Sequence, residues 1–201
     1  MANDAIEVHR WLPGTMAEAE VRSAGLMRKA AFYGERGATL SIEAERQAVQ
    51  ENLAIWVRGE GDESAPMFHA IREGGVLVTV AETFVRTIRI GPERRERDVL
   101  ALAGVVSDPA VRGRGLGAAV IRDAFARLDE EGIKQCLFQT GRARPLYERL
   151  GARLVTNRFV NRTAATREAA EANPWDDEWV MRFPAEAPWF DGVIDLNGPG
   201  Y

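Results

Sequence analysis

The segment from Val99 to Gly117 constrains the fold of this chain more than any other part of its 201 residues. An apolar run, VLALAGVV, leads through SDP into the turn sequence RGRGLG, and a helical pattern follows at once. This order predicts a buried strand, a glycine-rich turn and a helix. Such a turn directs several backbone N–H groups and the positive end of a helix dipole at one point, which favours a bound phosphate. Arg112 and Arg114 add full positive charges to the turn.

Three kinds of glycine-rich phosphate loop compete for this segment. A P-loop needs Lys and then Ser or Thr after its last glycine, but Ala118 and Ala119 follow Gly117. A dinucleotide fingerprint needs the spacing G-x-G-x-x-G, and the glycines at 113, 115 and 117 do not have it. An ordinary strand–turn–helix corner also remains as an alternative.

The third loop fits in register. The turn resembles the acyl-coenzyme A loop of the GNAT N-acetyltransferases, Q/R-x-x-G-x-G/A, through Arg112, Gly115 and Gly117. Pro109 precedes the arginine by three residues, as is frequent in that family. The flanking strand and helix strengthen the match, because a short motif counts only in its structural context.

A second segment is similar to the same family. After a predicted strand over 133–139, the chain resembles the GNAT pattern A-x-x-L-Y-E-K-L-G. The matching residues are Ala143, Leu146, Tyr147, Glu148, Leu150 and Gly151. Tyr147 holds the position of the family's usual general acid, although a half-buried aromatic on a short helix is the simpler alternative. The family often has Asn seven residues earlier, where this chain has Thr140, so one expected coenzyme contact departs from the pattern.

The resemblance implies an α/β (α+β) acyl-CoA N-acyltransferase fold. This is a central mixed, mostly antiparallel, twisted sheet of about six or seven strands flanked by helices. We expect one domain over 1–201, with the apolar segment 184–201 packed back on it. That tail is also similar to the ends of the nodulation N-acyltransferases. The segments around 176–177 and 183–184 are loosely similar to the aminoglycoside 2′-N-acetyltransferases.

Acetyl-CoA is the implied cosubstrate, and the implied contacts are spread over the strand 99–106 and the turn that follows it. The residues expected to bind it are Val105, Ser107, Arg112, Gly113, Arg114, Gly115, Leu116 and Gly117. In this family the strands 99–106 and 133–139 splay apart, which frees the backbone of Val105 and Ser107 to bond the pantetheine arm like an added strand. A backbone N–H near Val105 or Val106 would stabilise the oxyanion. Tyr147 would protonate the leaving thiolate.

The general base and the acceptor are not readable from the sequence. Ala103 stands where the aminoglycoside enzymes carry a glutamate. A water chain, or a carboxylate from elsewhere such as the C-terminal group of Tyr201, would have to replace it. The expected acceptor is a primary amine of a small molecule, such as an amino sugar or an aminoglycoside-like compound. A protein N-acetyltransferase and a non-catalytic acyl-CoA sensor are the alternatives. Five acidic residues could line a pocket for a cationic amine or be solvated surface: Asp176, Asp177, Glu178, Asp191 and Asp195.

Composition excludes several classes of function. A net charge of −4 gives no general attraction to nucleic acid. With one cysteine and two histidines, neither a disulfide, nor a metal site, nor a His-based catalytic triad is predicted. No signal-peptide pattern or long apolar run is present, so we expect a cytoplasmic protein without a membrane partner. A homodimer is compatible with the sequence.

Apolar periodicity and turn residues predict the remaining elements. We expect helices over 15–31, with Thr15 as a cap, over 41–53, over 116–131, ending at Gly132, and over 144–150. The charged segment 93–98 is expected to be a solvated loop, and 161–177 loop-like with a helical turn. Strands are expected over 5–12, 66–72, 76–90, 99–106, 133–139, 154–160 and 179–183.

Overall fold

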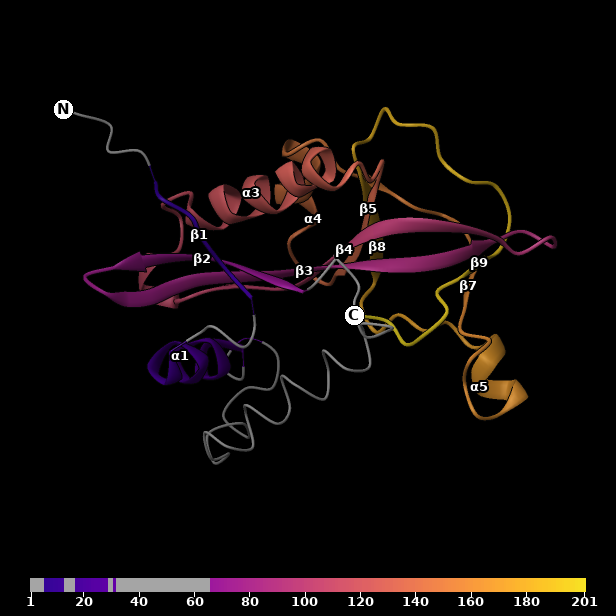
Figure 1. Ribbon diagram of the computed structural model, residues 1–201, viewed down its shortest axis with the longest axis horizontal. Helices are drawn as coiled ribbons and strands as arrows, with labels where there is room; N and C mark the ends of the chain where they lie inside the picture. Colours follow the sequence, from indigo (N-terminus) through magenta and orange to yellow (C-terminus); the bar gives the residue numbers. More distant parts are fainter. Residues whose placement is uncertain (1–5, 13–16, 29–30, 32–65) are drawn as a thin grey trace.

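A long antiparallel hairpin of strands β3 (Val76–Ile90) and β4 (Arg95–Ser107) forms the middle of the molecule (Figure 1). The computed structural model describes residues 6–12, 17–28, 31 and 66–201. The strands are β1 (His9–Trp11), β2 (Met67–Glu73), β3 (Val76–Ile90), β4 (Arg95–Ser107), β5 (Cys136–Thr140), β6 (Arg153–Leu154), β7 (Phe159–Val160), β8 (Trp179–Phe183) and β9 (Ile194–Asp195). The helices are α1 (Glu18–Arg28), the 3₁₀ turn η4 (Pro109–Val111), α3 (Leu116–Glu131), α4 (Arg144–Arg149) and α5 (Arg167–Glu171).

These strands form one nine-stranded sheet. Seven of them are successive neighbours in the order β1-β2-β3-β4-β5-β8-β6, while β9 pairs with the outer end of β3 and with β7. Among the described strands, the pairs β4–β5 and β7–β9 are parallel and the others are antiparallel. The predicted mixed, mostly antiparallel sheet flanked by helices is therefore confirmed.

Each face of the sheet has its own cover (Figure 1). Helices α3 and α4 lie on one face, where Phe125 and Tyr147 pack around Phe138 of β5. On the opposite face, α1 packs over β2 and β3, and the C-terminal segment brings Tyr201 against Phe84 of β3. Both faces are therefore buried over the middle of the hairpin, and a polar group there needs a specific explanation.

Helix α3 follows directly from the sequence. Leu116, Val120, Ala124 and Leu128 recur at four-residue steps and are all buried, because this spacing places them on one stripe of the helix. The helix ends at Gly132, which adopts a left-handed conformation with φ of 68°, as is usual for a C-terminal glycine. The prediction for this helix and its end is confirmed.

None of the helices in the described ranges has the length and hydrophobicity of a membrane-spanning segment.

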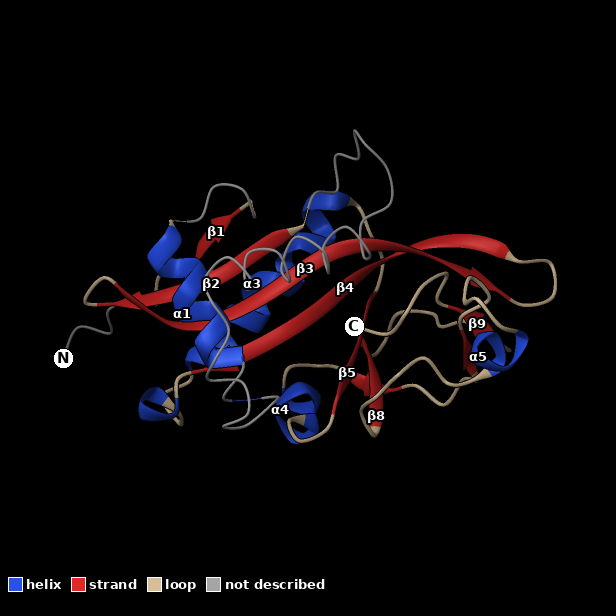
Figure 2. Ribbon diagram, turned by 90° about the horizontal axis from the view of Figure 1, so that it is seen from below, coloured by secondary structure: helices blue, strands red, loops and turns tan. Residues whose placement is uncertain are grey.

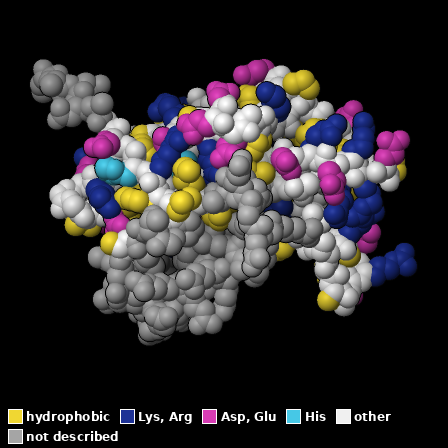
Figure 3. Space-filling model, viewed as in Figure 1, with side chains coloured by type: hydrophobic (Ala, Val, Ile, Leu, Met, Phe, Trp, Pro, Cys, Tyr) yellow, Lys and Arg dark blue, Asp and Glu magenta, His cyan; other side chains and the backbone are white. Residues whose placement is uncertain are grey.

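The prediction of a solvated loop over 93–98 is wrong for its last four residues. Strand β4 begins at Arg95, and a short turn around Arg94 connects it to β3. The charged side chains pair across the hairpin, where Arg89 donates to Glu96 over 3.0 Å and Thr87 donates to Asp98 over 2.7 Å. Acidic and basic side chains lie next to one another over this outer part of the hairpin, at the right of Figure 3. A strand exposed to water can carry charges at every position, so charge alone did not indicate a loop.

The strand predicted over 154–160 is divided into two short strands. Residues 153–154 form β6 and pair with β8, whereas residues 159–160 form β7 and pair with β9. The first strand is shorter than predicted, covering 9–11, and the first helix is α1 over 18–28. The Thr15 cap and the helix predicted over 41–53 lie outside the described residues.

Candidate functional site

The glycine-rich turn has the backbone shape of an anion site. Gly113 and Gly115 have φ of 80° and 84°, and Gly115 is the N-cap of α3. A Cβ at either glycine would meet nothing within 4 Å. Glycine is therefore needed here for the left-handed backbone rather than for space within the protein. The amide of Ala119 donates to the carbonyl of Gly115 over 3.1 Å, and the amides that precede it in the first turn have no intrahelical acceptor.

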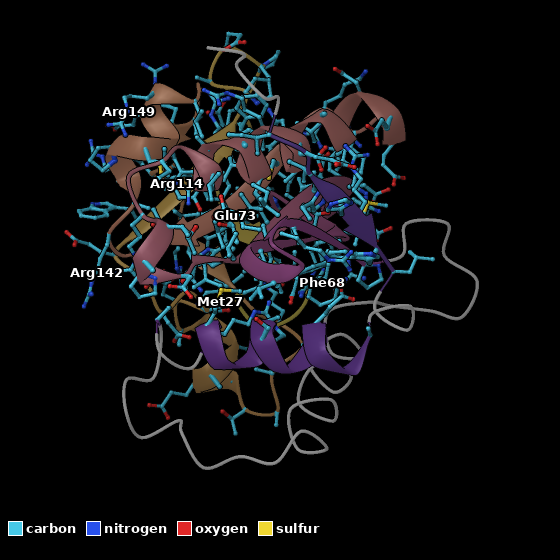
Figure 4. The ribbon with its side chains drawn as sticks, turned by 90° about the vertical axis from the view of Figure 1, so that its left-hand side faces the viewer. Met27, Phe68, Glu73, Arg114, Arg142 and Arg149 are labelled. Carbon is cyan, nitrogen blue, oxygen red and sulfur yellow. The ribbon has the colours of Figure 1, made fainter. Side chains whose placement is uncertain are left out.

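The two arginines of the turn differ in their availability. Arg114 makes two hydrogen bonds to the carboxylate of Glu73, of 2.7 and 2.6 Å, across to the β2–β3 hairpin (Figure 4). Arg112 is exposed and has no ion-pair partner in the described part of the chain. Leu116 is buried in the core, so it anchors the start of α3 and can offer a ligand its amide rather than its side chain. Of the two guanidinium groups, only that of Arg114 is engaged in an ion pair within the described residues.

Within the described residues, strand β4 has an unpaired edge that runs to this turn. Its pairing with β5 is limited to Leu100 and Ala101, although β4 continues to Ser107. Figure 2 shows β5 diverging from β4, and the predicted splaying of these two strands is confirmed. The amide of Asp108 donates to Val78 of β3 over 2.8 Å. Because successive amides of a strand point in opposite directions, those of Ser107 and Val105 point away from β3 toward the opened edge.

A β-bulge interrupts β4 next to this edge. Val80 pairs with Val106 and Glu82 with Ala103, so β4 has one residue more than β3 between these pairs. Gly104 adopts a φ of 58° at this point, as glycine does in one common class of bulge. Bulges increase the local twist and redirect the strand, which helps β4 to leave β5 here.

Tyr147 lies on α4 and is buried, not half-buried. Its ring packs against Phe138 of β5, with 4.5 Å between the ring centroids. Burial raises the pKa of Tyr147 well above its usual value, and the nearby Cys136 and Asp177 raise it further. The phenol therefore stays protonated at neutral pH and can donate a hydrogen bond. A phenol with so high a pKa is better suited to hold a developing thiolate by a hydrogen bond than to give up its proton in full.

Thr140 has a structural partner. Its hydroxyl accepts a hydrogen bond of 3.1 Å from the amide of Ala143 and so fixes the turn before α4. The preceding residue, Gln139, uses its side-chain oxygen to accept from the amides of Asp176 and Asp177, at 2.9 and 2.8 Å. These bonds place the loop before β8 beside the end of β5, and they bring Asp177 close to Tyr147.

The five acidic residues singled out in the sequence do not form one cluster. Asp195 is buried and accepts hydrogen bonds from Arg94 and from the amides of Arg162 and Asn197. It therefore holds the C-terminal segment. Asp191 lines a shallow exposed pocket near Trp189 at the outer part of the hairpin. The three residues 176–178 are exposed, and they alone lie near the opened edge of the sheet.

Contrary to expectation, one histidine lies in a triad-like arrangement. His69 of β2 contacts Asp123 of α3 over 2.6 Å and the hydroxyl of Thr83 over 2.7 Å. The histidine and the threonine are completely buried, and Arg127 also donates to the same hydroxyl over 2.9 Å. These contacts join strands β2 and β3 to α3, so the arrangement has a structural role. The pKa of His69 is lowered, chiefly by burial, which keeps the ring neutral.

Sequence reasoning missed one carboxylate near the site. Glu82 of β3 is buried opposite Ala103 of β4 and forms an ion pair with Arg28 of α1. Residues 82 and 103 are neighbours only through the register of the hairpin. No local motif marks such a pair, although a lone Glu within an apolar strand of fifteen residues is a signal in itself.

Comparison with known proteins agrees with this geometry. The family model of the acetyltransferase (GNAT) family matches residues 40–152, more than half of the chain. The chain belongs to the GNAT acetyltransferase family. It is therefore an N-acetyltransferase, and the family implies an acyl-CoA cosubstrate. No curated protein was found to match the chain.

Several solved structures, acetyltransferases among them, have a similar fold. A GCN5-related N-acetyltransferase from Kribbella flavida has a TM-score of 0.54 at 20% identity, covering 74% of this chain and 33% of that one. This chain thus spans only a third of that protein's length. An acetyltransferase from Trypanosoma brucei has a TM-score of 0.54 at 20% identity, covering 74% and 94%. ElaA from Escherichia coli has a TM-score of 0.55 at 13% identity, covering 88% and 98%. At these identities the similarity concerns the fold alone.

Proposed function

We propose that this GNAT enzyme transfers an acetyl group from acetyl-CoA to the primary amine of a small molecule, by direct attack within a ternary complex. The observation that carries the proposal is the opened edge of β4, which ends at a left-handed glycine turn and the N-terminus of α3. A long ligand that combines a hydrogen-bonding arm with a pyrophosphate fits these two features together.

The residues present suit coenzyme A. The amides of Leu116 and Gly117, at the first turn of α3, would bind the pyrophosphate together with those of the turn residues Gly113 and Gly115. Arg112 would add a charge-assisted hydrogen bond, and Arg114 would do so after release from Glu73. The backbone of Val105 and Ser107 would bond the pantetheine arm as an added strand.

The chemistry then needs three actions from the protein. The amide of Val105 would donate to the thioester oxygen, on which negative charge grows as the amine attacks. Tyr147 would donate a hydrogen bond to the departing sulfur, since its raised pKa keeps it protonated. Holding both reactants in one site makes the attack effectively unimolecular.

A cationic amine is favoured as acceptor by the charge beside the site. The exposed carboxylates of 176–178 lie next to the end of β5, and Asp177 is close enough to Tyr147 to influence its pKa. Such carboxylates attract an ammonium group from solution. An amino sugar or aminoglycoside-like compound has this charge, as does the lysine side chain or N-terminus of a protein acceptor.

Calorimetric titration with acetyl-CoA, followed by thiol detection with a panel of amines and basic peptides, tests the proposal. Saturable binding and thiol release with one class of small amine is the expected result. Release with peptides alone would assign a protein acceptor instead. Binding without turnover would indicate an acyl-CoA sensor, and absence of binding would refute the assignment of the turn.

A further inference from the structure

Strand β3 carries a buried carboxylate, that of Glu82, beside the position where β4 has Ala103. Glu82 of β3 is directly opposite Ala103 of β4 in the antiparallel register, and its side chain is almost completely buried. Directly opposed residues of a sheet project from the same face. The Glu82 carboxylate therefore stands on the same face of the sheet as the Ala103 methyl group, one strand further from the opened edge.

The surroundings of Glu82 give no packing reason for a charged residue. Its neighbours along the same face of β3 are Val80 and Phe84, both completely buried, and its partner on β2 is the buried Phe68. An ionised carboxylate in such a place loses its hydration, which destabilises a fold unless the charge has a partner. A carboxylate retained under this penalty is a candidate for a chemical role.

The partner of Glu82 comes from the helix over this face. Arg28, the last residue of α1, forms an ion pair with the carboxylate. The guanidinium group crosses the bulge of β4 so closely that a Cβ at Gly104 would overlap it. Figure 4 shows the contact region of α1 with the sheet, between Met27 and Phe68. Arg28 therefore contacts both the Glu82 carboxylate and the bulge of β4 at Gly104.

Among the described residues, two arginines are the charged groups that face Glu82 from the elements packed around it. Arg28 comes from α1, and Arg86 follows four residues along the same face of β3, with Tyr201 of the C-terminal segment against it. β4 contributes only Ala103 and Gly104, and β2 contributes the apolar Phe68. Burial raises the pKa of Glu82 and Arg28 opposes this rise.

We propose that Glu82 is the general base of the acetyl transfer and accepts the proton of the acceptor ammonium through a water molecule. This inference rests on the proposed function. One strand spacing, about 4.8 Å, separates β3 from the opened edge of β4, so the carboxylate would reach the amine through a bridging water rather than directly. Tyr147 lies on the opposite face of the sheet, so the base and the hydrogen-bond donor to sulfur approach the thioester from different sides.

The protons and electrons balance in this scheme. The acceptor ammonium gives one proton to Glu82, and the freed nitrogen lone pair forms the N–C bond to the thioester carbonyl carbon. The C–S bond breaks and its electron pair leaves with sulfur. A second proton from the nitrogen ends on the thiol, and Glu82 returns its proton to solvent.

The test is Glu82→Gln, which keeps the size of the side chain and removes the base. Its control is Glu96→Gln, which makes the same change on an exposed residue of the same hairpin. Thiol release is measured against pH with a primary alkylamine that the wild type accepts, and also with hydroxylamine, whose lone pair is free at neutral pH. Acetyl-CoA affinity and the thermal midpoint are measured for each variant.

We expect Glu82→Gln to lower kcat/KM for the alkylamine by about 10²-fold or more. The loss with hydroxylamine should be only a few-fold, and acetyl-CoA affinity should not change. The wild-type rate should rise with pH through a pKa above the usual glutamate value, because only the ionised carboxylate accepts a proton. Arg28→Gln removes the opposing positive charge and should move this rise to higher pH. In the Glu82→Gln background, Ala103→Glu returns a carboxylate to the same face and should restore part of the alkylamine rate.

Two results would overturn the assignment of Glu82 while the proposed function stands. One is an unchanged alkylamine rate and pH profile in Glu82→Gln. The other is an equal loss with both amines, which indicates a structural role. A wild-type protein that binds acetyl-CoA but releases no thiol with any amine would refute the proposed function itself, and the base with it.

Discussion

Replacing Gly115 by alanine separates the backbone requirement of the turn from its role in binding. Gly115 has a φ of 84° and space around its missing side chain. The cost of Gly115→Ala is therefore that of a left-handed backbone at a non-glycine residue, about 1–2 kcal/mol. For a chain of this length, that cost lowers the thermal midpoint by about 2–8 °C.

Gly132 is the matched control. It also has a left-handed φ, of 68°, and nothing within 4 Å of its missing Cβ, but it lies at the other end of α3. Gly132→Ala should lose a similar amount of stability without affecting the phosphate site. Gly115→Asn should lose less than Gly115→Ala, because asparagine tolerates the left-handed conformation.

Binding distinguishes the two alanine variants. If the backbone at residue 115 relaxes to a negative φ, one or two amides of the turn no longer point at the phosphate. Each such charge-assisted hydrogen bond contributes about 1.5–3 kcal/mol, so Gly115→Ala should weaken acetyl-CoA binding at least about tenfold. Calorimetry and thermal unfolding on both variants check this. Equal acetyl-CoA affinity in Gly115→Ala, Gly132→Ala and the wild type would refute the assignment of the turn.

Three further changes test neighbouring features. Glu73→Gln releases Arg114 and removes a negative charge beside the turn, so acetyl-CoA should bind a few-fold more tightly at low salt. Added salt should reduce this gain in affinity. Weaker acetyl-CoA binding would show that Glu73 instead holds the loop in place. Tyr147→Phe keeps the packing on Phe138 and should lower kcat about 10²-fold with unchanged acetyl-CoA affinity, and full turnover would exclude the tyrosine from catalysis. Cys136 is completely buried and its thiol pKa is raised well above the usual value, so a thiol reagent should modify it only in denaturant; reaction in the native protein would contradict this burial.

The elements that were predicted well depend on local patterns. The four-residue apolar repeat and Gly132 were enough to predict α3, and the turn residues Gly74 and Gly75 between two predicted strands were enough for the β2–β3 hairpin. The phosphate turn is equally local, because its glycines and arginines act on the backbone within a few residues.

The elements that were predicted wrongly depend on pairing partners that lie outside the segment itself. Residues 153–160 pair with β8 at one end and with β9 at the other. No short-range sequence pattern predicts that this segment divides between two partners. Residues 95–98 are a strand because Arg89 and Thr87 lie across from them. The buried His69 has its partners on β3 and α3, so its arrangement was not visible from the sequence.

By itself, the sequence determined the strand–turn–helix unit that suits a pyrophosphate, and the family to which the chain belongs. Those features depend on glycine torsion angles and apolar periodicity, both of which act within one or two turns of chain. Only the tertiary structure decided which charges are available at the site. An ion pair from the glycine-rich turn to the β2–β3 hairpin engages Arg114 with Glu73, and the register of β3 against β4 places Glu82 beside Ala103 and under Arg28. The strand register and the docking of α1 depend on burying apolar side chains over the whole sheet, so the sequence of one segment does not determine them.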